Sequence, residues 1–145
     1  MSGSIFSIIG SALNAQDLRM GAISSNLANA SSVAAPGEQP YRAHELVFQA
    51  QPVVGGEYDG GDPSGNAGLG VQVVANVQSN APPAMKYDPG NPYANASGYV
   101  TSSNVSPVEE MVNMIDSSHS YSASVAMLQQ ASRIDQQMIN SFQVA

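Results

Sequence analysis

The 145-residue chain contains no cysteine and no tryptophan, and only four of its residues are basic. Without cysteine there is no disulfide framework, no thiol nucleophile and no cysteine-ligated metal site. A net charge of −7 leaves no basic surface for phosphates, so we expect neither nucleic acid nor an anionic membrane as a partner. No apolar run reaches the roughly 18 residues that cross a bilayer, and the first residues lack the basic start, apolar core and cleavage site of a secretory signal. We therefore expect neither membrane insertion nor a cleaved signal peptide.

Charged side chains of both signs are scarce, at 10% of the residues where about 25% is usual. Polarity comes instead from 21 Ser, 11 Asn and 11 Gln. Such residues can be buried between neighbouring chains without the desolvation cost of unpaired ions. The composition therefore favours helices that form surfaces between subunits, although two helices packed on each other within one small hairpin remain the simpler alternative.

Proline and glycine are concentrated in the middle of the chain. All nine prolines lie between Pro36 and Pro107, and ten of the thirteen glycines lie between Gly37 and Gly98. Both residues are unfavourable inside helices. The distribution predicts an α+β fold with long N- and C-terminal α-helices, packed as a coiled-coil-like pair, and a turn-rich β and loop segment between them. The expected boundaries are 1–33, 34–105 and 106–145, and the two helical segments form one core domain.

The first segment carries apolar residues at helical spacing. The apolar residues that follow one another at steps of three and four are Ile5, Ile9, Ala12, Met20, Ile23 and Leu27. Polar Gln16 occupies the position of this stripe between Ala12 and Met20. Ile8 and Leu13 lie beside the stripe and widen it. Serines and asparagines follow from Ser25 onward and favour competing local hydrogen bonds. We therefore expect this helix to end near Ala30.

The last segment has a clear helix start. Ser106 suits the N-cap position, Pro107 the first helical position and Glu109 the third. The stripe that follows contains Met111, Ile115, Tyr121, Val125, Leu128, Ile134, Met138 and Phe142. A helix from residue 107 to about 142 is roughly 50 Å long. Because a compact domain of this size cannot cover such a length, the helix needs a partner.

In the middle segment, one kind of side chain alternates with another from residue to residue, as in β-strands. The clearest alternation runs from residue 69 to 78, and weaker patterns cover 41–51, 85–87 and 99–101. Residues 55–70 are rich in glycine and aspartate, which predicts a loop. Part of that loop, 59–66, resembles a calcium-binding loop, but Ala67 replaces the required glycine and Val73 the bidentate glutamate, so a simple loop is favoured.

Residues that carry chemistry are few and dispersed. His44 and His119 are 75 positions apart, without the clustered ligands of a zinc site. No Gly-x-Ser-x-Gly elbow and no phosphate-binding glycine loop occurs. Glu109 and Glu110 are adjacent on a helix, and adjacent helical residues do not face each other as a catalytic pair would. Their negative charges instead interact favourably with the dipole at the N-terminus of the helix. We expect no catalytic residue, no metal site and no cofactor.

Several motifs are similar to those of the bacterial flagellar rod and hook family. AISSNLANA at 22–30, preceded by SALNAQ at 11–16, resembles the N-terminal signature of that family. EMVNMI at 110–115 and SYSA at 120–123 resemble its C-terminal helix motif. QPYRA at 39–43, VFQ at 47–49, YDPGNP at 87–92 and GYV at 98–100 narrow the resemblance to a short subunit of the proximal rod over nearly the whole chain.

The sequence also departs from the family pattern. His119 stands where the C-terminal motif usually has arginine, and Ser124 stands where it usually has asparagine. The usual leucine-rich ending is replaced by INSFQVA at 139–145, and residues 55–68 look like an insertion. These departures concern subunit contacts rather than the fold.

The resemblance implies a non-enzymatic building block of the rod, the drive shaft that crosses the periplasm in the flagellar basal body. Its implied partners are other copies of itself, other rod subunits, membrane-ring and export-gate proteins at the rod base, and the flagellar type III export apparatus. The expected subunit-interface residues all lie on the two terminal helices: Ile9, Ala12, Leu13, Ile23, Asn26, Leu27, Asn29, Met111, Ile115, Tyr121, Val125 and Leu128.

Two alternatives remain open. One is another axial component of the flagellum, such as a different rod subunit or a short hook-related protein. The other is a periplasmic peptidoglycan-binding module or wall-cutting enzyme, which would need a carboxylate such as Glu45 or Glu57 in a pocket.

Overall fold

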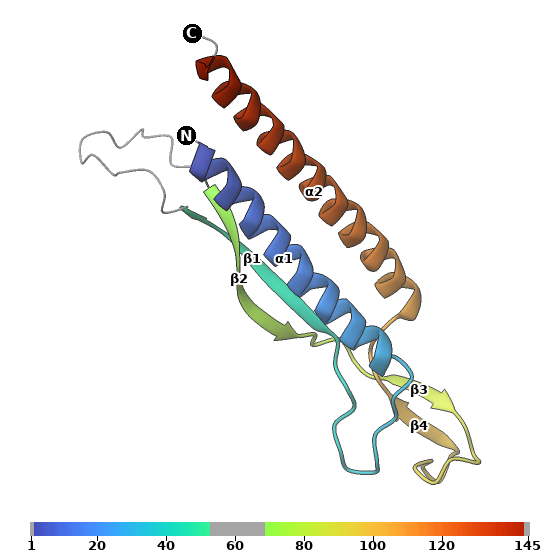
Figure 1. Cartoon of the computed structure of the whole chain (residues 1–145). Helices are drawn as coiled ribbons and strands as arrows, with labels where there is room; N and C mark the ends of the chain where they lie inside the picture. Colours follow the sequence, from blue (N-terminus) through green and yellow to red (C-terminus); the bar gives the residue numbers. More distant parts are fainter. Residues whose placement is uncertain (1, 53–68, 144–145) are drawn as a thin grey trace. The chain divides into compact units, whose positions relative to one another are not determined.

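The computed structural model of the chain describes residues 2–52 and 69–143 (Figure 1). The order of elements confirms the α+β class, with a helix at each end and four strands between them. The elements are α1 (Ser2–Asn29), β1 (His44–Pro52), β2 (Leu69–Gln78), β3 (Ala84–Tyr87), β4 (Tyr99–Ser102) and α2 (Pro107–Gln143). The insertion at 55–68 and the calcium-like stretch at 59–66 lie outside the described residues.

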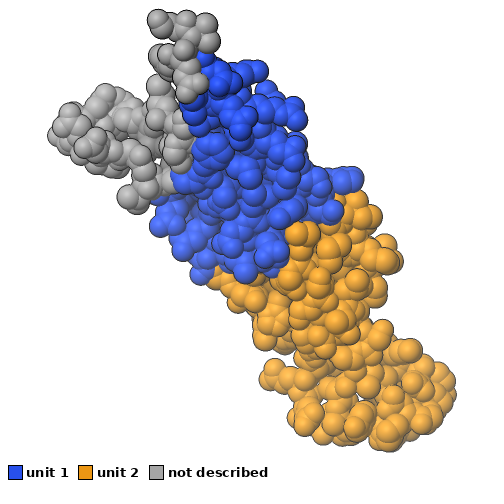
Figure 2. All heavy atoms as spheres, viewed as in Figure 1, with its two compact units in different colours: residues 1–18, 48–74, 117–145 blue, residues 19–47, 75–116 orange. Residues whose placement is uncertain are grey.

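The chain divides into two compact units, coloured separately in Figure 2. Unit 1 contains residues 1–18, 48–74 and 117–145, and unit 2 contains residues 19–47 and 75–116. Both helices and the two-stranded sheet of β1 and β2 contribute residues to each unit. Every contact described below lies within a single unit.

The predicted helix ends are confirmed. At the end of α1, the Asn29 side chain donates to the Ser25 carbonyl (2.9 Å), and the Ser32 hydroxyl and amide both donate to the Asn29 carbonyl. These bonds satisfy carbonyls and turn the chain out of the helix. At the start of α2, the Ser106 hydroxyl accepts from the Glu109 amide (3.5 Å), as an N-cap residue does.

In unit 2, β3 and β4 form an antiparallel pair with Ala84 opposite Ser102 and Tyr87 opposite Tyr99. The chain that leaves α1 joins this pair, because Ala34 donates to the Thr101 carbonyl (2.9 Å). Val100 is the apolar centre of this region, with 1% of its surface exposed. The end of α1 is thereby fixed to β4.

In unit 1, the apolar core is small. Ile9 and Ala15 are its only buried apolar side chains among the residues that the structure describes. The Ser11 hydroxyl of α1 accepts from the Val71 amide of β2 (3.1 Å). Within the described ranges, neither helix is long and apolar enough to cross a membrane.

Candidate subunit interface

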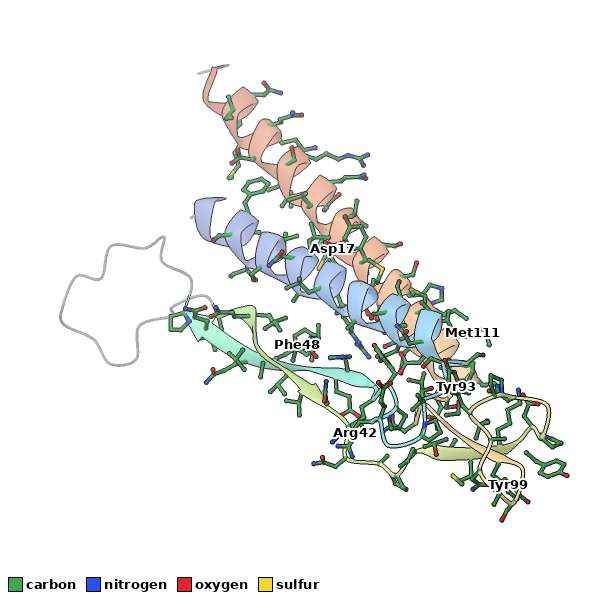
Figure 3. All side chains as sticks on the ribbon, turned by 90° about the horizontal axis from the view of Figure 1, so that it is seen from below. Asp17, Arg42, Phe48, Tyr93, Tyr99 and Met111 are labelled. Carbon is green, nitrogen blue, oxygen red and sulfur yellow. The ribbon has the colours of Figure 1, made fainter. Side chains whose placement is uncertain are left out.

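Two small polar residues of α2 are buried. Ser117 has none of its surface exposed and Ser124 only 7%, whereas apolar side chains on other sides of the helix are open to solvent. Met111, in the first turns of α2, is labelled in Figure 3. The exposed apolar side chains of α2 are Val108, Met111, Val112, Ile115, Tyr121, Met127, Ile134, Met138 and Ile139. Two serines of α2 are thus buried while many of its large apolar side chains are exposed.

The twelve residues expected from the sequence fall into three classes of exposure. Those that are buried within the chain are Ile9, Ile23 and Asn26. Those that are half-buried are Ala12, Leu13, Asn29, Val125 and Leu128. Those that are exposed are Leu27, Met111, Ile115 and Tyr121. The exposed group is the one available to a second molecule, and the role of all twelve in a subunit interface stays a prediction.

Asn26 joins three segments of unit 2. Its Oδ1 accepts from the His44 amide (2.8 Å) and from the Tyr41 hydroxyl (3.1 Å). Its Nδ2 donates to the His44 carbonyl (3.0 Å) and to Glu110 Oε1 (3.2 Å). An amide side chain has two acceptor and two donor positions, so all four are used. With 1% of its surface exposed, Asn26 fixes the start of β1 and the first turn of α2 to α1.

Glu110 is the acidic member of this group. One of its oxygens, Oε2, is buried without a hydrogen-bond partner. Burial raises the pKa of its carboxyl above the ordinary value of 4.5, although the hydrogen bond from Asn26 lowers it. The carboxylates of Glu109 and Glu45 raise the pKa further. The group is therefore stabilised in its neutral form by its surroundings.

An apolar groove lies in unit 1, between the first turns of α1 and the last turns of α2. Its volume is about 440 Å³. The α1 side is formed by Ile5, Phe6, Ile8 and Ile9, and the α2 side by Met127, Gln130, Ala131, Ile134, Asp135 and Met138. Protein interiors leave few voids larger than a water molecule, so a groove of this size is a place where another side chain can pack.

The candidates for chemistry are the histidine and carboxylate side chains of the described residues. No group of three or more His, Asp or Glu side chains among them is placed to hold a metal ion. His44 is engaged with Asn76 (3.0 Å), and Glu45 is exposed on β1. Glu57, the other carboxylate considered for a wall-cutting enzyme, lies outside the described residues.

Two features of this surface were not found from the sequence. Asn26 and Glu110 are 84 positions apart, and nothing in either segment indicates their pairing. The apolar stripe of α2 in the sequence runs through Met111, Ile115 and Tyr121. It omits Val108, Val112 and Met127, which are also exposed. The relevant signal is the serine series at 117, 120 and 124, whose spacing of three and four marks the inward side of the helix.

Comparison with known proteins matches both ends and most of the length of the chain. A family model described as "Flagella basal body rod protein" matches residues 8–34, and one described as "Flagellar basal body rod FlgEFG protein C-terminal" matches residues 96–141. The chain is 46% identical over 124 residues to "Flagellar basal-body rod protein FlgC" of Salmonella typhimurium, across 86% of this chain and 85% of the relative. The protein of that name in Escherichia coli O157:H7 is 47% identical over 124 residues, with the same coverage. The one in Bacillus subtilis is 39% identical over 127 residues, across 81% of this chain and 83% of the relative. The chain belongs to the family of flagellar basal-body rod protein FlgC.

Proposed function

We propose that the chain is a structural subunit of the proximal rod of the bacterial flagellar basal body and has no enzymatic activity. The observation that carries this proposal is the 46% identity to a flagellar basal-body rod protein across 86% of the chain. The subunit assembles through its terminal helices into the helical shaft that transmits torque to the hook.

The surface of the helices supports this role. Leu27 on α1 and Met111 and Ile115 on α2 expose between 37% and 57% of their surface. Exposed apolar residues at helical spacing are suited to packing against neighbouring helices, as in coiled coils. Contacts of this kind between unlike surfaces continue from subunit to subunit without closing.

The proposed partners are other copies of the chain, other rod subunits, and the membrane-ring and export-gate proteins at the rod base. The chain reaches the rod through the type III export apparatus, without a cleaved signal peptide. Its proposed division is an assembly helix at 1–33, an insert at 34–105 and an assembly helix at 106–145. Because most helical stability in proteins comes from packing, we expect the parts of the terminal helices that have no partner within the chain to be incompletely folded before assembly.

Fractionation of the native cells tests the proposal. Basal bodies are released from membranes with detergent, and mass spectrometry measures the ratio of this chain to other rod subunits. We expect a fixed ratio between them. A chain that remains soluble while the basal bodies are complete contradicts the proposal.

A second candidate is another axial component of the flagellum. It is favoured by the match of residues 96–141 to a family model whose description names FlgEFG rather than FlgC. Crosslinking to neighbours in purified basal bodies separates the two. Neighbours at the rod base support the proximal rod, and neighbours at the hook support the second candidate.

A further inference from the structure

Methionine supplies all the sulfur of this chain, because the sequence contains seven methionines and no cysteine. The structure describes six of them, and they differ in exposure. Met20 and Met114 are half-buried. The methionines that expose between 46% and 56% of their surface are Met85, Met111, Met127 and Met138. A thioether that reaches solvent is open to oxidation to the sulfoxide, which is polar where methionine is apolar.

Two of the exposed methionines lie in the apolar groove of unit 1. Met127 and Met138 line it from α2, and Ala131 and Ile134 lie between them on the same wall. These positions are i, i+4, i+7 and i+11 of one helix, so they share one face. The two methionines thus mark the ends of an apolar stripe about 17 Å long, at 1.5 Å per residue.

The groove gives a small oxidant access to both thioethers. Its volume is about 440 Å³. A cavity of about 15 Å³ already holds one water molecule, so a small peroxide can enter this groove. Met85 differs, because it lies in unit 2 and its Sδ accepts a hydrogen bond from the Thr101 hydroxyl (3.8 Å). Met111 also belongs to unit 2 and is not part of the groove.

Oxidation by a peroxide makes the groove wall polar. A sulfur lone pair attacks one peroxide oxygen, and the S–O bond forms as the O–O bond breaks. The sulfur loses two electrons, and the other oxygen takes the remaining proton and leaves as water. Eight of the ten residues that line the groove are apolar. Because a polar group without partners is costly among them, each sulfoxide turns to solvent and withdraws its side chain from the stripe.

We propose that Met127 and Met138 are paired oxidation sites in the groove of unit 1, and that a peroxide-type oxygen donor which converts them to sulfoxides weakens the association of the first turns of α1 with the last turns of α2. The change is reversible, since methionine sulfoxide reductases restore the thioether. The inference is independent of the proposed function, because it concerns contacts within one chain.

Peptide mapping by mass spectrometry tests the reactivity of the two sites. The purified full-length chain is treated with hydrogen peroxide at pH 7, and the sulfoxide at each methionine is measured over time. We expect Met127 and Met138 to react about fivefold faster than Met20 and Met114, because reactivity follows exposure. In concentrated urea the differences disappear. Equal rates in the folded chain overturn the inference.

Hydrogen exchange of residues 2–18, the α1 part of unit 1, tests the consequence. We expect exchange to become about fivefold faster after peroxide treatment, because local opening becomes easier. The test variant, Met127→Leu with Met138→Leu, keeps apolar side chains of similar volume and does not respond to peroxide. The control variant, Met85→Leu with Met111→Leu, loses two exposed thioethers outside the groove and responds as the parent chain does.

A sulfoxide reductase that acts on both epimers is expected to restore slow exchange in the treated parent chain. Should the double variant fail to fold, Met127→Leu and Met138→Leu are measured singly, and each is expected to remove part of the response. A full response to peroxide in the test variant overturns the inference. Exchange of residues 2–18 that is as fast as in an unstructured peptide before treatment also overturns it, because there is then no association to weaken.

Discussion

At the scale of single residues, the side-chain amide of Asn26 connects three segments of unit 2. Its amide bonds to Tyr41, to both main-chain groups of His44 and to Glu110. The neighbouring Asn29 makes one side-chain bond, to the carbonyl of Ser25 in its own helix. Two asparagines of one short motif therefore have very different structural roles.

Replacing Asn26 by alanine leaves the Glu110 carboxyl and both His44 main-chain groups without these partners. Because buried polar groups that lose their partners are costly, we expect Asn26→Ala to lower the free energy of unfolding by about 3 kcal/mol. Asn29→Ala is the matched control and changes it by less than about 1 kcal/mol. Near-UV circular dichroism of the tyrosines during urea unfolding measures both, since the chain has no tryptophan. Equal effects of the two substitutions contradict the role assigned to Asn26.

Glu110 gives the chain a pH dependence of stability. Burial raises the pKa of its carboxyl in the folded chain above 4.5, so the folded state binds a proton at this group more tightly than the unfolded state does. The stability from this group is present below the unfolded pKa and is lost as the pH rises through the folded pKa. In Glu110→Gln the side chain keeps an oxygen for Asn26 and has no charge. We expect the variant to be more stable than the parent chain at pH 7, with the difference shrinking toward pH 4.

Urea unfolding of both chains at a series of pH values measures this difference. Glu109→Gln is the control, because Glu109 is exposed at the start of α2. A gap between Glu110→Gln and the parent chain that widens as the pH falls would reverse the sign and contradict the prediction.

At the scale of elements, the turn between β3 and β4 depends on one glycine. Gly98 has a φ of +79°, and a Cβ added there would be 2.8 Å from the Tyr87 ring. Gly37 has a φ of +88° but open space around it. We expect Gly98→Ala to lower the free energy of unfolding by about 3 kcal/mol and Gly37→Ala by about 1 kcal/mol, because only the first adds a clash to backbone strain. Thermal unfolding of the full chain measures the loss of stability in each variant. Equal losses in Gly98→Ala and Gly37→Ala would contradict the close approach of residue 98 to Tyr87.

The exposed apolar residues of α1 give a functional prediction for that helix. Leu27 exposes 37% of its surface beside the buried Asn26, so an aspartate there leaves the core intact but places a charge on the helix surface. We expect Leu27→Asp to abolish motility in soft agar while the amount of chain made stays normal. Ser24→Asp, also exposed on α1, is the control and leaves motility unchanged. Normal swimming of the Leu27→Asp variant would show that this face of α1 is not needed for assembly.

The elements could be predicted from the sequence far better than their packing. Proline and glycine mark the limits of both helices, and alternation marks β2 from Leu69 to Gln78, because these signals are local in the chain. The orientation of α2 could not be predicted, since hydrophobicity alone would turn Met111 and Ile115 inward. The structure instead buries Ser117 and Ser124. The orientation depends on the parts of the chain against which α2 packs, and the spacing of residues in one segment does not specify them.

At the scale of the whole molecule, the net negative charge of each copy opposes contacts between the helices of different copies. Each copy carries a net charge of −7 and the sequence pI is about 4.3, so copies repel one another at pH 7. The proposed contact between copies is mainly apolar. Screening should therefore remove the repulsion and leave the attraction almost unchanged.

We expect the purified chain to associate more as sodium chloride is raised from 0.05 M to 1 M at pH 7, because the Debye length falls from about 14 Å to about 3 Å over that range. Sedimentation velocity at a fixed chain concentration measures the mean mass. Val112→Asp should stay monomeric at the highest salt, since screening does not restore the apolar side chain that is 61% exposed in the parent chain, whereas Gln129→Asp should follow the parent chain. Association that weakens as salt rises would mean that ion pairs hold the copies together. The exposed apolar side chains of α2 would then only align surfaces that charge had already brought into contact.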